Sequence, residues 1–214
     1  MRFKFILLII TVFIFCSAAF AQYPPIENNL DRKVKAFLED NANSWTDMNV
    51  PLTDGKILYD LIIENNYTKA LEIGTSTGHS AIWMAWALSK TGGKLITIEI
   101  DKQRYLEAKA NFKRSGLSKY ITVKLADAHE MVPKLKGEYD FVFSDADRIW
   151  YKNYFIAMNP KILVGGCYTC NNAAVRVNGI SEFLKYVESL KNYETTINRD
   201  SRAGISISFK KAAK

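Results

Sequence analysis

LEIGTSTG, residues 71–78, is an apolar run that ends in a turn with glycines at positions 74 and 78. A helical pattern follows, and a second apolar run closes on an acidic residue, Glu99, twenty-one positions after Gly78. This order of strand, glycine-bearing turn, helix and acidic strand end is typical of the nucleoside site of open α/β sheets. The glycines let the backbone approach a ligand closely, and the carboxylate accepts ribose hydroxyls. The segment therefore predicts an α/β fold with a nucleoside site between Gly74 and Glu99.

The glycine-bearing turn carries no group suited to phosphate. Residues 72–78 follow the pattern E-x-G-x-x-x-G, without the third glycine of a dinucleotide loop and without lysine or arginine. Dinucleotide-binding loops use G-x-G-x-x-G to hold a pyrophosphate against backbone amides at a helix N-terminus. A cofactor that lacks phosphate suits the present turn better. The turn thus predicts S-adenosylmethionine and disfavours a nicotinamide-dependent dehydrogenase.

Strand and helix patterns alternate over most of the chain. Short strands, each followed by a helical pattern, are expected at residues 69–74, 94–99, 121–126, 139–144 and 167–170. Two closing runs, residues 194–198 and 204–209, alternate apolar and polar residues as an antiparallel pair would. This alternation predicts a doubly wound, Rossmann-like α/β sheet with helices on both faces. The sheet is expected to be mostly parallel, with a closing antiparallel strand.

Two helical patterns precede the first strand. Residues 30–41 carry apolar side chains at helical spacing and predict an accessory helix. A second helix is expected to run to about Asn65, with Thr53 or Asp54 as its N-cap because their side-chain oxygens can accept from free backbone amides.

Polar residues follow five of the expected strands. They lie at or just beyond the strand ends, at Glu72, Glu99, Asp127, Asp145 and Asn171. Ligands of doubly wound sheets bind beyond the carboxyl ends of the strands. We therefore predict that these five strand ends build an enzyme site.

Length and composition favour one globular domain with ordinary core content. The chain has 214 residues, 48% of them hydrophobic, and a net charge of +7. Its lysines are scattered, without an arginine-rich stripe or interleaved aromatic residues, so we predict no nucleic-acid partner. Two histidines give little support to a histidine-based triad or a zinc site.

Residues 1–21 have the layout of a signal peptide. Arg2 and Lys4 precede an apolar run at residues 5–15, and Ala19-Phe20-Ala21 provides an A-x-A cleavage site. The apolar run is short for a spanning helix, which needs about 20 residues. We predict export to the periplasm or medium, with a membrane-anchored protein as the alternative if the segment is not cleaved.

After such cleavage the chain would contain only Cys167 and Cys170. The C-x-x-C spacing invites a redox or zinc interpretation. Within a strand, however, odd spacing places the two side chains on opposite faces. We therefore predict two buried thiols.

Four short motifs follow one another along the chain. They are Met48-Asn49-Val50, the loop at residues 71–80, Asp145-Ala146-Asp147-Arg148 with Tyr151 and Tyr154, and Gly165-Gly166 followed by Asn171-Asn172. In order and spacing they resemble the class I S-adenosylmethionine-dependent O-methyltransferases of the catechol and caffeoyl-CoA type. The resemblance covers roughly residues 45–210.

By position, the resemblance implies a set of residues along the length of S-adenosylmethionine. The implied cofactor-binding set is Val50, Glu72, Gly74, Thr75, Gly78, Ser80, Glu99, Asp127, Ala128, Asp145 and Asp147. Within it, Glu72 and the loop at Gly74 would hold the amino acid group, and Glu99 would bind the ribose. Asp127 and Ala128 would flank the adenine.

The resemblance also implies a divalent metal ion, Mg²⁺, held by Asp145, Asn171 and Asn172. The family usually has aspartate where Asn171 stands. Mg²⁺ favours carboxylate oxygens, so the loss of one carboxylate should weaken its binding. The sequence therefore leaves metal dependence open.

Asp145 and Arg148 are the predicted catalytic residues. The family usually has lysine at position 148, and a lysine with a lowered pKa can take the proton of a substrate hydroxyl. Arginine stays protonated and cannot act as a general base. Arg148 would instead stabilise a phenolate electrostatically, while Asp145 orients the hydroxyl.

These features predict a methyltransferase acting on a small, hydroxylated and aromatic substrate. The expected organisation is a signal peptide at residues 1–21, a tether and accessory helix at 22–47, and a methyltransferase domain at 48–214. The resemblance makes a homodimer through the accessory helix possible. The alternative function is an exported, non-catalytic binding protein on a methyltransferase scaffold, which the changes at Arg148 and Asn171 would suit.

Overall fold

The computed structural model describes residues 23–46, 48–175 and 179–213. The predicted signal peptide at residues 1–21 lies outside these ranges. The α-helices are α1 (Asn29–Asp40), α2 (Leu52–Glu64), α3 (His79–Thr91), α4 (Lys102–Ser115), α5 (Ala128–Lys134), α6 (Tyr151–Met158) and α7 (Ile180–Glu188). The strands are β1 (Lys69–Ile73), β2 (Lys94–Glu99), β3 (Ile121–Leu125), β4 (Tyr139–Ser144), β5 (Ile162–Cys170), β6 (Tyr193–Asn198) and β7 (Ile205–Lys210).

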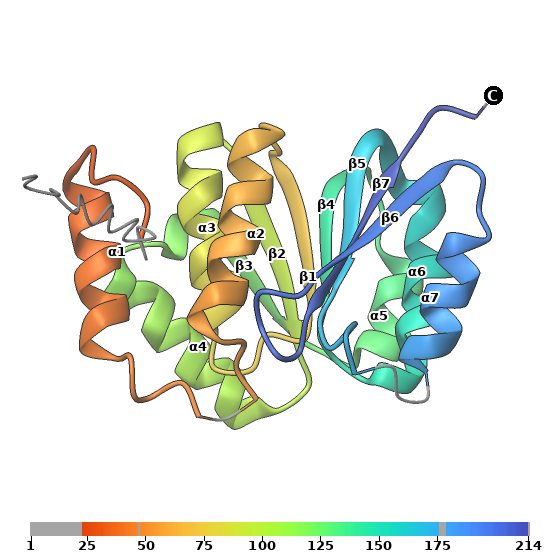
Figure 1. The fold of residues 1–214 in the computed structure, drawn as a ribbon. Coiled ribbons are helices and arrows are strands. Elements are labelled where there is room, and N and C mark those ends of the chain that lie inside the picture. The colour runs from red at the N-terminus through yellow and green to blue at the C-terminus, as the bar shows by residue number, and fades with distance from the viewer. Residues whose placement is uncertain (1–22, 47, 176–178, 214) are drawn as a thin grey trace, which may run out of the picture.

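The described strands form one sheet in the order β3-β2-β1-β4-β5-β7-β6. β1 pairs in parallel with β2 and β4, so that Leu71 lies opposite Ile96 and Val142. β7 is antiparallel to both β5 and β6, and it lies between them. Figure 1 shows α1 to α4 on one side of the sheet and α5 to α7 on the other. The predicted doubly wound, mostly parallel α/β sheet is confirmed.

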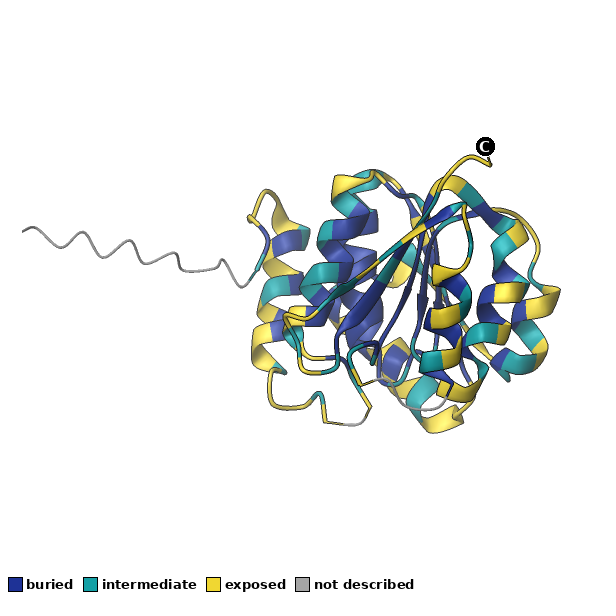
Figure 2. Ribbon diagram, turned by 45° about the vertical axis from the view of Figure 1, so that its right-hand side comes forward, coloured by how far each residue is buried: buried dark blue, intermediate teal, exposed yellow. Residues whose placement is uncertain are grey.

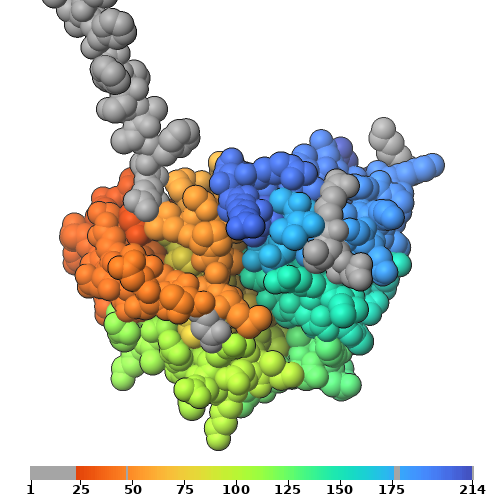
Figure 3. Space-filling model, turned by 60° about the horizontal axis from the view of Figure 1, so that its bottom comes forward, coloured from red at the N-terminus to blue at the C-terminus, as the bar shows by residue number. Residues whose placement is uncertain are grey.

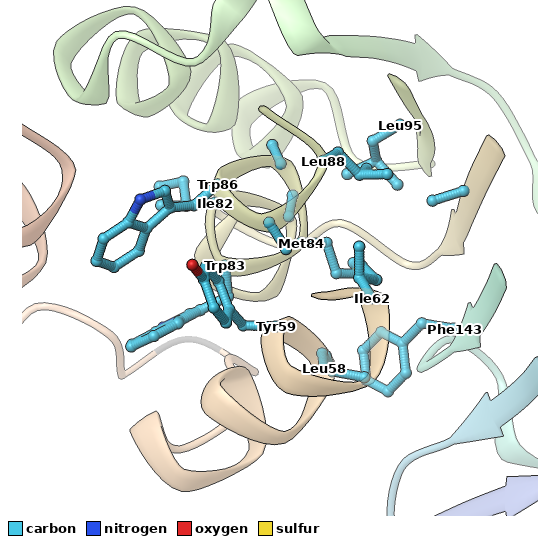
Figure 4. Close-up of a cluster of buried hydrophobic side chains, with 14 of the residues drawn as sticks. Leu58, Tyr59, Ile62, Ile82, Trp83, Met84, Trp86, Leu88, Leu95 and Phe143 are labelled. Atoms are coloured by element: carbon cyan, nitrogen blue, oxygen red, sulfur yellow. The ribbon is translucent and has the colours of Figure 1, made fainter. Parts of the chain in front are cut away.

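Each face of the sheet has its own apolar core. One core packs α2 and α3 against the sheet and contains Leu58, Trp83 and Phe143, as Figure 4 shows. The other packs α6 and α7 against the opposite face, around Phe155 and Phe183. Figure 2 shows the central strands buried and the outer helix surfaces exposed. The strands are therefore apolar on both faces, as a sheet covered by helices on both sides requires.

The two cysteines lie where the strand alternation puts them. Cys167 joins the core beneath α2 and α3, and Cys170 joins the core beneath α6 and α7. Both thiols are free and buried. Burial raises the pKa of Cys170 to about 12, so the thiol is held in its unreactive protonated form.

Two element boundaries differ from the sequence prediction. β5 begins at Ile162, five residues before the predicted start. α2 begins at Leu52 after Pro51, without a side-chain cap, so neither Thr53 nor Asp54 is the N-cap. Proline is well suited to a helix start because its fixed φ matches the helix and it has no amide to satisfy. Asp54 instead lies inside the first turn of α2 and is buried.

The predicted accessory helix is present as α1. It begins with a capping box in which the Asn28 and Asp31 side chains each accept from the other's backbone amide. The Trp86 indole of α3 donates to Asp31 over 2.7 Å, and the Lys90 amine lies 3.1 Å from the same carboxylate. α1 is thereby joined to the sheet-covering helix α3.

The helices of the described ranges are all too short or too polar to span a membrane.

Candidate functional site

The carboxyl ends of β1, β2 and β4 surround a cavity of about 300 Å³, here called the first cavity. Its lining includes backbone and side chains from each of these strand ends. The lining residues are Met48, Gly74, Ser76, Ile98, Glu99, Ile100, Arg104, Ala126, Asp127, Ala128, His129, Asp145, Ala146, Asp147 and Tyr154. In Figure 3 the orange N-terminal segment, the yellow-green α4 segment and the teal segment after β4 meet on the corresponding face.

The turn between β1 and α3 brings backbone to the wall of this cavity. Gly74 has a φ of +96°, which non-glycine residues rarely adopt. A Cβ at this position would lie 2.5 Å from the carbonyl oxygen of Asp145. The Gly74 and Thr75 amides both donate to the Ile98 carbonyl, over 3.1 and 3.2 Å. Gly74 is therefore required because three strand ends converge on it.

Glu72 is completely buried behind the turn. The hydroxyl groups of Ser80 and Thr97 donate to its two carboxylate oxygens. Burial raises the pKa of Glu72 to about 8, although the two hydroxyls act in the opposite direction. Glu72 therefore ties β1 to the first turn of α3 and to β2. It does not line the first cavity in this structure.

The other acidic strand ends face the first cavity and are held by backbone amides. Glu99 accepts from the Ser76 amide over 2.7 Å and from the Asp101 amide over 2.9 Å. Asp127 accepts from the His129 amide over 2.8 Å and so caps α5. Each carboxylate oxygen has a second lone pair, so these carboxylates can still accept hydrogen bonds from a ligand.

Asp145 lies at the end of β4, where the first cavity meets the β5 end. The Asn171 amide nitrogen lies 3.0 Å from its Oδ2, and the Tyr151 hydroxyl lies 3.5 Å from its Oδ1. Burial raises the pKa of Asp145 to about 7, while Asn171, the positive charge of Arg148 and Tyr151 lower it. The net effect of these groups and of burial is a pKa above the ordinary range of an aspartate.

The residues at this position do not fit a divalent metal ion. The Asn171 side-chain oxygen accepts from the Asn172 backbone amide over 2.7 Å. A backbone amide can only donate, so this contact orients the Asn171 side chain and leaves its NH₂ group facing Asp145. An NH₂ group carries no lone pair for a cation.

The structure brings part of the predicted cofactor-binding set together. The members that line the first cavity are Gly74, Glu99, Asp127, Ala128, Asp145 and Asp147. The members that do not line it are Val50 before α2, Glu72 in β1, Thr75 and Gly78 in the turn, and Ser80 in the first turn of α3. Their roles toward a cofactor stay a prediction, as does the catalytic role of Arg148, which is exposed.

A second cavity of about 440 Å³ lies beside the β5 end. It is lined by Pro51, Thr53, Asn172, Val175, Ser201, Arg202 and Ala203. The backbone connects its walls, because the Ala173 and Ala174 amides donate to the Gly204 and Ala203 carbonyls. Sequence reasoning missed this cavity, since the β6–β7 loop carries no motif and lies far along the chain from α2.

His129 forms an aromatic wall of the first cavity. Its ring stacks on Trp150 with centroids 4.1 Å apart, and Tyr154 adjoins both rings. Two carboxylates flank it, with Asp127 at 3.5 Å and Asp147 at 3.4 Å. Trp150 therefore lies near the predicted adenine end, whereas Tyr151 is buried in the core.

His79 holds the segment that contains Val50, a connection the sequence did not reveal. Its Nδ1 donates to the Val50 carbonyl over 2.8 Å, and its Nε2 accepts from the Trp83 indole over 3.1 Å. The indole contact requires the neutral imidazole, since a protonated Nε2 would face the indole N–H with a hydrogen of its own. Burial accordingly lowers the pKa of His79 to about 4.

We expect this histidine to make stability depend on pH. Above pH 6.5 it is neutral in the folded and unfolded chains; between 6.5 and about 4 only the unfolded chain takes up the proton. The free energy of unfolding should therefore fall by about 3 kcal/mol as the pH falls through this window. Urea unfolding of the wild type and His79→Gln at about pH 7 and about pH 4 measures the effect. Equal acid-induced losses in the two proteins would contradict it.

Comparison with known proteins agrees with this geometry. Residues 27–208 match the family model described as O-methyltransferase. The chain is 37% identical over 112 residues to a catechol O-methyltransferase of Niastella koreensis, covering 50% of each chain. It is 29% identical over 165 residues to caffeoyl-CoA O-methyltransferase 2 of Petunia hybrida, covering 72% of this chain and 68% of the relative.

A solved structure shares the fold. An O-methyltransferase from Bacillus cereus in complex with SAH superposes with a TM-score of 0.74 at 24% identity, covering 87% of this chain and 92% of that one. The family match spans most of the chain, including every strand of the sheet apart from the last residues of β7. This protein belongs to the O-methyltransferase family.

Proposed function

We propose that the protein transfers a methyl group from S-adenosylmethionine to a hydroxyl oxygen of a small aromatic substrate. The observation that carries this proposal is the first cavity, in which glycine backbone and four carboxylates converge. Relatives named for catechol and caffeoyl-CoA support a hydroxylated aromatic substrate. The Bacillus cereus neighbour, which is described with SAH, supports the cofactor.

The first cavity suits this cofactor in its charge and in the exposed backbone at Gly74. Its lining carries the carboxylates of Glu99, Asp127, Asp145 and Asp147, against the single guanidinium of Arg104. An acidic lining disfavours phosphate and favours a ligand with ribose hydroxyls and a positive charge. At Gly74 the absence of a Cβ lets the ligand lie directly against backbone.

The chain would position and polarise the reactants. When bound, S-adenosylmethionine supplies the electrophilic methyl group. Glu99 would bind the ribose, and His129 with Tyr154 would cover the adenine end. Asp145 would accept a hydrogen bond from the substrate hydroxyl and set its direction toward the methyl. Arg148 would stabilise the negative charge that develops on the oxygen as the hydroxyl proton passes to the Asp145 carboxylate and from there to solvent. The second cavity adjoins Asn172 and would hold the substrate.

Calorimetric titration with S-adenosylmethionine tests the cofactor assignment. We expect micromolar binding by the wild type and roughly 10- to 100-fold weaker binding by Glu99→Gln, because hydrogen bonds to a charged group contribute about 1.5–3 kcal/mol. Glu107→Gln on the exposed face of α4 is the matched control and should bind like the wild type. Equal affinity in Glu99→Gln would contradict the role of Glu99.

A panel of catechols and hydroxycinnamic acid derivatives then tests turnover. Methylated product shows the transferase reaction. Cofactor binding without product from any member would instead identify a binding protein on a methyltransferase scaffold.

We also propose that residues 1–21 direct export of the protein. The positive residues, apolar run and A-x-A site support this. Mass spectrometry of the protein from its native host should find an N-terminus at Gln22, and a retained Met1 would contradict cleavage.

A further inference from the structure

We infer that Asn171 and Arg148 together take the place of a divalent metal ion at Asp145. The amide of Asn171 occupies one carboxylate oxygen, and the guanidinium of Arg148 supplies positive charge. The inference rests on the proposed function, because it concerns how the same carboxylate faces a substrate hydroxyl. It goes further in assigning a metal-independent site.

The orientation of Asn171 is the first support. Its side chain bridges the Asn172 backbone amide, which can only donate a hydrogen bond, and the Asp145 carboxylate, which as an anion can only accept one. The amide oxygen must face the former, and the NH₂ group must face the latter. The direct 3.0 Å contact to Oδ2 thus fills the place where a cation shared by residues 145 and 171 would bind.

The charge balance is the second support. A site with carboxylates at positions 145 and 171 would need two positive charges for neutrality, which a divalent ion supplies. The present chain has one carboxylate at these two positions, and the positive charge of Arg148 acts favourably on it. One permanent positive charge therefore acts on one carboxylate, and arginine keeps that charge at any working pH.

Asp54 is a further acidic group that bears on this site. It is completely buried in the first turn of α2, and neither of its oxygens has a hydrogen-bond partner of ordinary geometry among the described residues. Its negative charge opposes that of Asp145, and the nearby Ser201 hydroxyl offsets little of the cost of burying it. A cation held by Asp54 and Asp145 is thus the competing arrangement, and the experiment must distinguish it.

Mn²⁺ binding, followed by electron paramagnetic resonance, tests the inference. The proteins are the wild type, Asn171→Asp, the double variant Asn171→Asp with Arg148→Lys, Asp145→Asn and Asp54→Asn. We expect no saturable Mn²⁺ binding by the wild type up to about 1 mM, and at least roughly tenfold tighter binding by the double variant. Asn171→Asp alone should show an intermediate gain in Mn²⁺ affinity. This single variant tests the inference if the double variant does not fold.

Titration of each protein with SAH separates this inference from the proposed function. Retained SAH binding shows that the fold and cofactor side are intact, whereas a wild type that binds no SAH contradicts the proposed function alone. Saturable Mn²⁺ binding by the wild type that is lost in Asp145→Asn or Asp54→Asn would overturn the inference. Variants with the Asn171→Asp substitution that bind SAH but gain no Mn²⁺ affinity would overturn it as well. Turnover, where measured, should change less than about twofold between EDTA and added Mg²⁺.

Discussion

Asp145→Asn should reduce kcat roughly 10²- to 10⁴-fold while leaving the fold and SAH binding largely intact. The substitution keeps the shape of the side chain but removes the negative charge that would accept and orient the substrate hydroxyl. In the wild type the Asn171 NH₂ group lies 3.0 Å from an Asp145 carboxylate oxygen, and the substitution replaces this carboxylate with a neutral amide. We expect the loss in kcat because the negative charge of Asp145 contributes most when the substrate hydroxyl loses its proton.

Single-turnover kinetics with saturating cofactor measures this effect. Asp60→Asn on α2 is the matched control, since that aspartate lies at the surface, pairs with Lys56 and does not line the first cavity. The control should keep wild-type turnover. If Asp145→Asn retains more than about a tenth of wild-type kcat, the role of Asp145 in orienting the hydroxyl is wrong.

Gly74→Ala should lower the free energy of unfolding by about 2–5 kcal/mol and abolish measurable cofactor binding. Part of the cost comes from the φ of +96°, which alanine adopts only with strain. The remainder comes from a Cβ placed 2.5 Å from the Asp145 carbonyl oxygen and 3.1 Å from the Ala146 Cα. Moving either atom would cost considerable energy, because both are backbone atoms of the segment after β4.

Gly137→Ala separates the two contributions. Gly137 has a nearly equal φ of +91°, but a Cβ there would meet nothing within 4 Å. This variant should lose only about 1–2 kcal/mol, the cost of the backbone conformation alone. Urea unfolding of both variants gives the difference, which we expect to be about 1–3 kcal/mol. Equal losses would show that the approach of Gly74 to Asp145 is not tight.

Local pattern predicted the strands and the β1–α3 turn because the signals for them are short-range. The glycines at 74 and 78 need positive φ, and both have it. The opposite faces of Cys167 and Cys170 followed from strand alternation alone. The prediction was wrong where a competing local signal prevailed. α2 begins at Leu52, directly after Pro51 and one residue before Thr53, and β5 extends back to Ile162 through its glycines.

The amino-acid sequence by itself determined the α/β class, the acidic residues at the strand ends and the motifs that resemble those of methyltransferases. These depend on periodicity and on residues close together along the chain. Only the tertiary structure decided how Asn171 faces Asp145, that His79 holds Val50, and that α2 and the β6–β7 loop enclose a second cavity. Such contacts join segments 26 to about 150 residues apart, and their geometry follows from the packing of the whole sheet, which no local pattern encodes.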